Sequence, residues 1–184
     1  LALASSNRYV PYNLSQDTVS HMKVNPVQYI YEPGSTMKPI VFSILLESGK
    51  LNQYEIINAY NGQMKIANKV ITDEHKMGSM TAEDGIVYSS NIVMAQIAQR
   101  LESGDYMNGL GKFGFGKKSG VDLSYELKGD LPSKSALATE IYKATVSYGY
   151  GMRANFMQII AAYNVFNNDG VYVTPKIADK IFAE

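Results

Sequence analysis

The most apolar segment of the chain, residues 40–46, follows a Pro-Gly turn signal at 33–34. This pattern predicts a helix over about 35–49. Apolar side chains cover most of its circumference, so we expect this helix to be buried on several sides. Pro39 cannot donate a backbone N–H, and therefore either the first turn is irregular or the helix begins there.

The rest of the chain alternates between short helical patterns and turns. Helices are predicted at 81–88, 92–101, 105–113, 136–148 and 156–166, with caps at Thr81 (paired with Asp84) and at Asn155. Residues 63–67 and 69–72 can pair as a small hairpin. Extended segments are predicted at 1–6, 171–175 and 176–182, and loops at 7–30 and 121–135. We therefore expect one mostly helical body with strands only near the two ends of the chain.

Composition narrows the function. The chain has 184 residues, and its 17 basic and 17 acidic residues balance, so charge does not point to nucleic acid or an anionic membrane. Cysteine is absent, which excludes disulfides and thiolate metal sites. His21 and His75 lie far apart in sequence, so neither a two-histidine metal site nor a Ser-His-Asp triad is expected. We see no signal peptide and no apolar run of about 18–20 residues.

Ser35 and Lys38 stand three residues apart at the start of the 35–49 helix. On a helix this spacing places both on one face, with Cβ atoms about 5–6 Å apart. The helix N-terminus favours developing negative charge near Ser35, and the same field with partial burial lowers the pKa of a lysine. A serine beside a lysine that can be neutral is a nucleophile beside a base. By itself the spacing also fits a capped surface helix with an exposed lysine, so the other motifs of the sequence must distinguish a catalytic pair from such a helix.

The triplet Ser89-Ser90-Asn91 lies between two predicted helices, where its side chains can point into a cleft. Ser89 can relay a proton between the lysine and a leaving group, and Asn91 can hold a substrate amide. The alternative is an N-cap serine followed by a turn asparagine.

Taken together, segments 31–39, 89–91, 113–116 and 147–151 resemble the transpeptidase domain of class B penicillin-binding proteins. Residues 1–5 resemble the strand that precedes the active-site helix in that family, and the resemblance covers essentially the whole chain. The Ser-x-x-Lys motif is a recognised signature of the family. The resemblance implies an α+β fold of the β-lactamase/transpeptidase type, here mainly its helical part with an incomplete antiparallel sheet.

The resemblance also implies roles for four side chains. Ser35 attacks the carbonyl between two terminal D-alanines of a peptidoglycan stem peptide, and Lys38 accepts the Ser35 proton. Ser89 passes a proton to the departing D-alanine, and Asn91 orients the substrate. The backbone N–H of Ser35 supplies half of an oxyanion hole. An amine from a second strand resolves the acyl-enzyme into a cross-link, whereas β-lactams mimic the substrate and remain attached to Ser35.

No cofactor, metal or nucleic acid is implied. The expected partners are peptidoglycan stem peptides, β-lactam antibiotics and, for the parent protein, other cell-wall synthesis proteins in cell division or cell shape. The expected location is the periplasmic or extracytoplasmic face. We expect the parent to be anchored in the cytoplasmic membrane by a segment outside this chain.

The third motif of the family is Lys-Thr-Gly or Lys-Ser-Gly on a sheet-edge strand. Residues 118–120 read Lys-Ser-Gly, but they follow a glycine-rich break and have no strand pattern around them. In the resembling proteins a Lys-x-Gly often stands here as a structural turn. The chain begins without methionine and ends in what reads as an element cut short. We therefore expect 1–184 to be a partial transpeptidase domain that lacks the third-motif strand and, alone, hardly reacts with penicillin.

Three alternative functions remain open. A serine β-lactamase shares Ser-x-x-Lys and the fold, but class A enzymes hydrolyse the acyl-enzyme with a glutamate in a Glu-x-x-Leu-Asn setting, which 125–129 do not supply. A penicillin-binding sensor is acylated and signals without turnover, and it would normally sit beside signalling segments that this chain does not show. A helical scaffold with coincidental motifs is the third. The sequence does not separate a division-specific from an elongation-specific transpeptidase.

Overall fold

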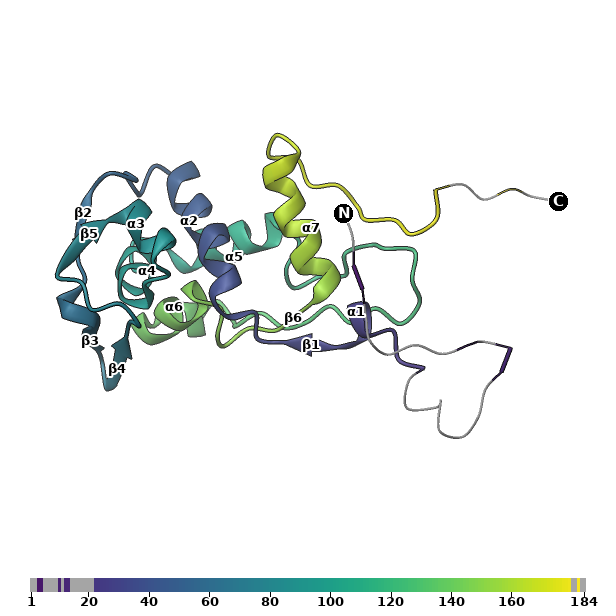
Figure 1. Cartoon of the computed structure of the whole chain (residues 1–184), viewed down its shortest axis with the longest axis horizontal. Helices are drawn as coiled ribbons and strands as arrows, with labels where there is room; N and C mark the ends of the chain where they lie inside the picture. Colours follow the sequence, from purple (N-terminus) through teal and green to yellow (C-terminus); the bar gives the residue numbers. More distant parts are fainter. Residues whose placement is uncertain (1–2, 5–9, 11, 14–21, 180–181, 183–184) are drawn as a thin grey trace.

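The computed structural model describes residues 3–4, 10, 12–13, 22–179 and 182. The described elements, in order, are α1 (Asn25–Gln28), β1 (Ile30–Tyr31), the 3-10 turn η2 (Gly34–Met37), α2 (Lys38–Glu47), β2 (Ile56–Asn58), η3 (Tyr60–Gly62), β3 (Gln63–Ile66), β4 (Lys69–Thr72), β5 (Ser79–Thr81), α3 (Ala82–Val87), α4 (Asn91–Ala98), α5 (Ser103–Lys112), η4 (Ala136–Ala138), α6 (Glu140–Ser147), β6 (Ala154–Asn155) and α7 (Phe156–Asn167). Helix α2 stands at the centre, with strands β2 to β5 on one side and α7, with the β1–β6 pair beneath it, on the other (Figure 1).

Helix α2 is buried on several sides, as its apolar pattern predicts. Ile40, Val41 and Leu45 have no solvent exposure, and the helix packs against α4 and α5. Gly109 of α5 lets the two helices approach closely, since a Cβ built there would lie 2.7 Å from Ile44 Cγ2. The central helix is therefore clamped by its neighbours, which fixes the position of its N-terminus.

The first turn of this helix is irregular, which is one of the two outcomes that Pro39 predicts. Residues 34–37 form a 3-10 turn and the α-helix begins at Lys38, so Pro39 falls in its first turn. Proline is tolerated there because the N–H groups of a first turn have no helical acceptor. The predicted helix at 35–49 is thus confirmed with a change of helix type near Lys38.

The predicted caps are confirmed. Thr81 and Asp84 form a reciprocal capping box on α3, and Asn155 forms another with Gln158 on α7. In each box a side chain accepts a bond from a free N–H of the first turn, and the partner side chain returns to the N-cap backbone. Both helices therefore begin where local sequence signals place them.

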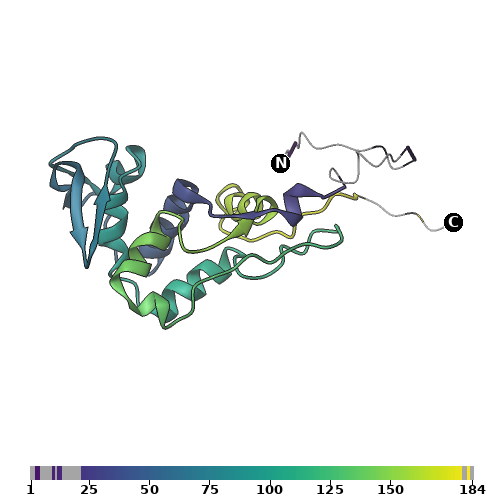
Figure 2. The same ribbon diagram turned by 90° about the horizontal axis from the view of Figure 1, so that it is seen from below.

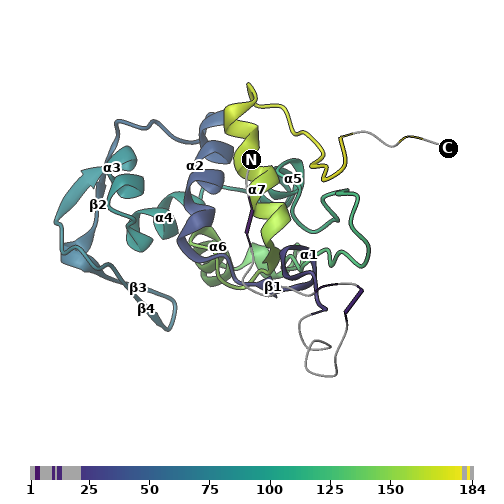
Figure 3. The ribbon, with the colours of Figure 1, turned by 45° about the vertical axis from the view of Figure 1, so that its right-hand side comes forward.

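The prediction that strands occur only near the two ends was wrong. Three two-stranded antiparallel sheets form, and two of them, β2–β5 and β3–β4, lie within residues 56–81. The β3–β4 hairpin was anticipated, and it extends from the body beside α4 (Figure 3). The β2–β5 pair was missed because three-residue strands are too short to show alternation. Its burial pattern shows the cause, since Ile57 and Met80 face the core while Ile56 is exposed.

The remaining predictions concern the ends and the long loop. The strand predicted at 1–6 lies mostly outside the described residues, and Leu3 and Ala4 have no regular structure. The loop predicted at 7–30 was wrong for 25–28, which form α1 with Pro26 in its first turn. Residues 171–179, in the described part of the expected extended segments, form neither helix nor strand.

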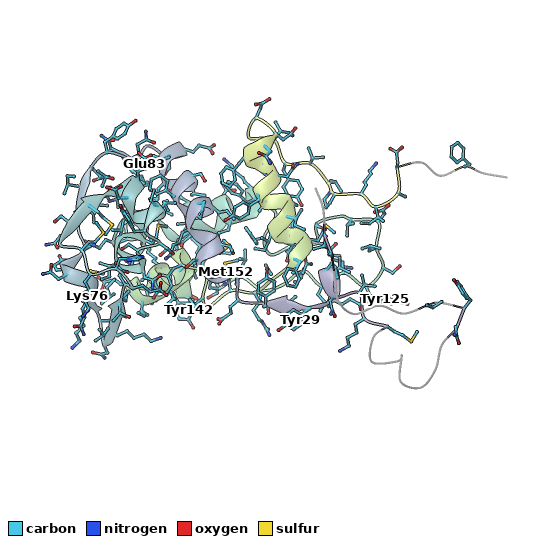
Figure 4. The ribbon with its side chains drawn as sticks, viewed as in Figure 1. Tyr29, Lys76, Glu83, Tyr125, Tyr142 and Met152 are labelled. Carbon is cyan, nitrogen blue, oxygen red and sulfur yellow. The ribbon has the colours of Figure 1, made fainter. Side chains whose placement is uncertain are left out.

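The irregular stretch after α5 runs along one side of the body toward α1 (Figure 2), where the Leu127 N–H donates to Val27 O at 2.9 Å. Figure 4 labels Lys76 on the hairpin side of the molecule, and Tyr29 and Tyr125 on the other half, near α1. None of the helices formed by the described residues combines the length and the apolar character needed to cross a lipid bilayer.

Candidate active site

The turn that carries Ser35 is held by a segment more than a hundred residues further along the chain. The Gly34 N–H donates to Gly149 O at 3.1 Å, and the Gly151 N–H donates to a Glu32 carboxylate oxygen at 2.8 Å. Gly149 has φ +85°, and a Cβ built there would lie 2.0 Å from Gly34 O. Segments 31–39 and 147–151, which the sequence singles out separately, therefore form one unit.

Ser35 itself is exposed on this turn. The first N–H groups of a helical turn have no partner inside the turn. The Gly34 N–H is taken by Gly149, whereas no acceptor for the Ser35 N–H is found among the described residues. The Tyr163 hydroxyl donates to Thr36 O at 2.8 Å and holds the turn from the side of α7. An exposed hydroxyl thus lies next to a free backbone donor.

Lys38 is buried, with 2% of its surface exposed. Its Nζ donates to Ser89 Oγ at 2.9 Å and also to the Ser89 carbonyl oxygen. Burial lowers the pKa of Lys38 to about 8, against the opposing negative charges of Asp73 and Glu74. The predicted lowering of this pKa is confirmed, and burial is its leading cause.

Ser89 lies between the other two side chains. Its Oγ donates to Ser35 Oγ at 3.3 Å, so a continuous series runs from Ser35 through Ser89 to Lys38. No hydrogen bond joins Ser35 directly to Lys38 in the described part of the chain. The sequence predicts these two on one face, but not that a third side chain would come between them. Ser89 has φ +54°, in the left-handed region that residues with a Cβ seldom adopt.

The sequence allows two interpretations of 89–91, a catalytic one and a helix-capping one, and the capping one applies to only one of the three residues. Ser90 is the N-cap of α4, and its Oγ accepts from the Val93 N–H at 3.0 Å. Asn91, the first residue of α4, donates from Nδ2 to Thr72 O at 3.0 Å, and its Oδ1 has no partner among the described residues. Ser90 therefore takes the capping role, while Ser89 is exposed and the Asn91 side-chain carbonyl has no partner among the described residues.

Residues 118–120 lie in a different environment. The Ser119 and Gly120 N–H groups donate to the two carboxylate oxygens of Glu126 at 2.8 and 3.3 Å, and Ser119 is only 4% exposed. Asn155 Nδ2 also reaches Glu126, which ties this loop to the start of α7. These residues form no strand. The segment is an irregular loop bound by Glu126, and it does not form the strand that the third motif of the family requires.

Thr72 and Asp73 were not predicted to contribute to the site. Asp73 accepts from the Ser90 hydroxyl and from the Ile92 N–H, and Thr72 O accepts from Asn91. The available signal was a carboxylate directly after a predicted hairpin strand, which is common in turns. Within the described residues, no group of three or more His, Asp or Glu side chains is arranged to hold a metal ion.

The exposed serine, buried lysine and bridging serine are carried on a fold that known proteins share. The family model described as the penicillin binding protein transpeptidase domain matches residues 1–183. The chain belongs to this family, and the expected fold class is confirmed.

Its relatives are named as peptidoglycan D,D-transpeptidases or penicillin-binding proteins. The peptidoglycan D,D-transpeptidase FtsI of Buchnera aphidicola is 32% identical over 172 residues, which cover 94% of this chain and 30% of that protein. FtsI of Escherichia coli K12 is 29% identical over 172 residues, covering 94% and 29%. Penicillin-binding protein PbpB of Mycobacterium tuberculosis is 27% identical over 180 residues, covering 96% and 26%. The chain spans about 30% of the length of these curated relatives.

Two solved structures have the same fold. The transpeptidase domain of penicillin-binding protein 3 from Burkholderia pseudomallei, in its apo form, gives a TM-score of 0.81 at 28% identity, covering 87% of this chain and 48% of that one. A peptidoglycan glycosyltransferase from Burkholderia ambifaria gives 0.82 at 27% identity, covering 87% and 50%.

Proposed function

We propose that this chain carries the acylation machinery of a serine D,D-transpeptidase that cross-links peptidoglycan stem peptides. The observation that carries the proposal is the series Ser35 Oγ, Ser89 Oγ, Lys38 Nζ, which ends on a buried lysine with a pKa of about 8. At pH 7 about one such lysine in ten is neutral, compared with fewer than about one in a thousand for an ordinary lysine. A base is therefore available to an exposed serine at neutral pH.

The first half-reaction follows from this series. Ser35 Oγ attacks the carbonyl carbon between the two terminal D-alanines and forms a C–O bond. The Ser35 proton moves to Ser89 Oγ as the Ser89 proton moves to Lys38 Nζ, because a hydroxyl both donates and accepts. The carbonyl oxygen becomes an oxyanion beside the free Ser35 N–H, where a preorganised donor stabilises it. As the C–N bond breaks, the proton returns from Lys38 through Ser89 to the amine of the departing D-alanine.

The second half-reaction uses the same groups in reverse. The amine of a second stem peptide attacks the ester carbon, gives up a proton along the series, and releases Ser35 as the new amide forms. Asn91 accepts an amide N–H of the substrate at its Oδ1, which has no partner among the described residues. A β-lactam acylates Ser35 by opening its ring, so its leaving group stays attached and the ester persists.

We propose that the second oxyanion donor and a cationic contact for the substrate carboxylate come from a third-motif strand outside 1–184. The burial of Ser119 against Glu126 supports this, because it withholds 118–120 from that role. The names of the relatives, peptidoglycan D,D-transpeptidases, support a cell-wall enzyme. We propose that it acts with other synthesis proteins in cell division or cell shape. Because peptidoglycan lies outside the cytoplasm, we propose an extracytoplasmic or periplasmic location, with the parent anchored in the cytoplasmic membrane.

The environment of Glu126 favours a transpeptidase over a β-lactamase. This side chain is 5% exposed, and its two oxygens accept bonds from Ser119, Gly120 and Asn155. It is therefore engaged in the loop and does not supply a base for hydrolysing an ester on Ser35. A sensor would be acylated by the same route and differs only in turnover, and the relatives' names favour the enzyme.

The test is labelling of the purified parent protein, which includes the proposed third-motif strand, with a fluorescent penicillin, followed by peptide mapping of the adduct. We expect one adduct, on Ser35, and none in Ser35→Ala. Ser43→Ala is the matched control, because Ser43 lies on α2, directly after the Ser35 turn, and its hydroxyl donates to Pro39 O at 2.6 Å, away from the relay. An adduct of undiminished yield in Ser35→Ala would refute the proposed nucleophile.

A further inference from the structure

The turn at 89–91 carries backbone strain and needs external support. Ser89 keeps its left-handed conformation only if its surroundings hold it there. On one side, the Ser90 N–H donates to Gly85 O at 2.8 Å and the Ser89 N–H to Ile86 O at 3.1 Å. These bonds fix the turn to α3 but leave the start of α4 to be held from elsewhere.

The other side is held by the end of β4. Asp73 Oδ2 accepts from the Ser90 hydroxyl at 2.5 Å, and Asp73 Oδ1 accepts from the Ile92 N–H at 3.1 Å. Both carboxylate oxygens are thus bound to the first turn of α4, where free N–H groups favour negative charge. Ser90 is 1% exposed, so its bond to Asp73 is shielded from water.

We propose that Asp73 is a positioning residue for acylation. It holds Ser90 and the start of α4 so that Ser89 Oγ stays between Ser35 and Lys38. This inference rests on the function proposed above, in which Ser89 relays the proton. The role is separable from that of Thr72, which contacts Asn91 only through its backbone oxygen.

Asp73 also acts on Lys38 through its charge. Its carboxylate raises the pKa of Lys38 against the effect of burial, and Glu74 acts in the same direction. The charged residues of the other elements around α2 have little effect on the pKa of Lys38. Helix α4 has no charged residue, and Asp105 of α5 pairs with Lys50 beyond the far end of α2. Asp84 of α3 is engaged in its capping box.

This charge provides a readout that a merely structural role would not move. Acylation requires neutral Lys38, so its rate rises with pH through the Lys38 pKa to a plateau. Removing a negative charge lowers that pKa, and the rise then occurs at lower pH. Asp73→Asn removes the charge but keeps the shape, because its oxygen can accept from Ile92 while its amide nitrogen donates to Ser90.

The experiment compares Asp73→Ala, Asp73→Asn and Glu74→Gln by the pH dependence of acylation with a fluorescent penicillin. Glu74→Gln is the matched control, since Glu74 is exposed and makes no hydrogen bond to the 89–91 turn. We expect Glu74→Gln to shift the rise to lower pH with the plateau unchanged. Asp73→Ala should lower the plateau about a hundredfold, since a misplaced group costs about that much. Asp73→Asn should shift the rise and keep more of the plateau than Asp73→Ala.

Each result has a separate meaning. If the wild-type parent protein, which includes the third-motif strand, carries no adduct on Ser35, the proposed function fails. If wild type is labelled on Ser35 and folded Asp73→Ala reaches the same plateau, only the positioning role fails. If circular dichroism shows that Asp73→Ala does not fold, the comparison of Asp73→Asn with Glu74→Gln decides. The proposal would be overturned if Asp73→Asn reached the same plateau as Glu74→Gln and its rate rose at the same pH as that of wild type.

Discussion

Replacing Lys38 by methionine should separate the chemistry of the site from its stability. Methionine has a similar length and no charge, so it fills the buried space of Lys38 without the cavity that alanine would leave. The relay then ends on a group that accepts no proton. Loss of a general base costs about 10²–10⁴ in rate, and we expect acylation to fall by that factor.

In contrast to the acylation rate, the free energy of unfolding should not fall in Lys38→Met. The lowering of the Lys38 pKa from 10.5 to about 8 means that folding disfavours its charged form by about 3 kcal/mol at neutral pH. Methionine removes this cost, while the two lost hydrogen bonds to Ser89 contributed about 1 kcal/mol each. The expected net change at pH 7 is therefore between about zero and +1 kcal/mol.

The pH dependence gives a second check on the same reasoning. The folded-state pKa lies below the ordinary value, so the unfolded chain binds more protons at Lys38 between about pH 8 and 10.5. The contribution of Lys38 to stability therefore rises with pH across that window and is absent from Lys38→Met.

Intact-mass kinetics with penicillin and chemical denaturation at pH 7 and pH 10 measure both quantities. Lys38→Arg serves as the control that keeps a charge, and it should lose both activity and stability. Acylation of Lys38→Met at the wild-type rate would remove lysine as the base. A difference in stability between wild type and Lys38→Met that does not change with pH would refute the burial argument.

Three further changes test other parts of the molecule. Ser89→Ala breaks the relay and should slow acylation about a hundredfold, measured by the same labelling. It should also lower the melting temperature by about 2–4 °C, because Lys38 loses one hydrogen bond. Gly149→Ala should lower both the melting temperature and the acylation rate, because its Cβ would meet Gly34 O; Gly170→Ala, also at positive φ but in open space, should lower only the melting temperature. Thr81→Ala removes an N-cap and should cost about 1 kcal/mol in denaturant unfolding without changing the acylation rate.

Local signals were enough to predict the helices that carry the site. The apolar run at 40–46 predicts α2, and Asn155 predicts the start of α7, because each signal acts within one or two turns. The buried lysine could also be anticipated, since a helix that is apolar on most sides leaves little solvent for Lys38. Element type was therefore predictable where the determining contacts are close in sequence.

Long-range contacts were not predictable in the same way. The insertion of Ser89 between Ser35 and Lys38 depends on how α4 packs against α2. Its left-handed conformation could not be read from a serine, which usually avoids it. The hydrogen bonds of Asp73 to the start of α4 depend on where the β3–β4 hairpin lies, and packing in the folded core determines that position. The strand pair β2–β5 was missed for a related reason. Burial of Ile57 and Met80 in the core determines which face of this pair points inward, and strands of three residues are too short to show that pattern in the sequence.

Because of the contact between Gly34 and Gly149, the site can assemble only late in the synthesis and folding of the chain. Residues that determine the orientation of Ser35 are separated from it by more than a hundred positions, and contacts of such separation form after local helices. During synthesis, α2 and α4 can form while the Ser35 turn still lacks its support. A ribosome-bound chain should take up no fluorescent penicillin before residue 151 has emerged. Folding of residues 147–151 back onto the Ser35 turn is therefore a precondition for any reaction of the nascent protein with an acyl donor.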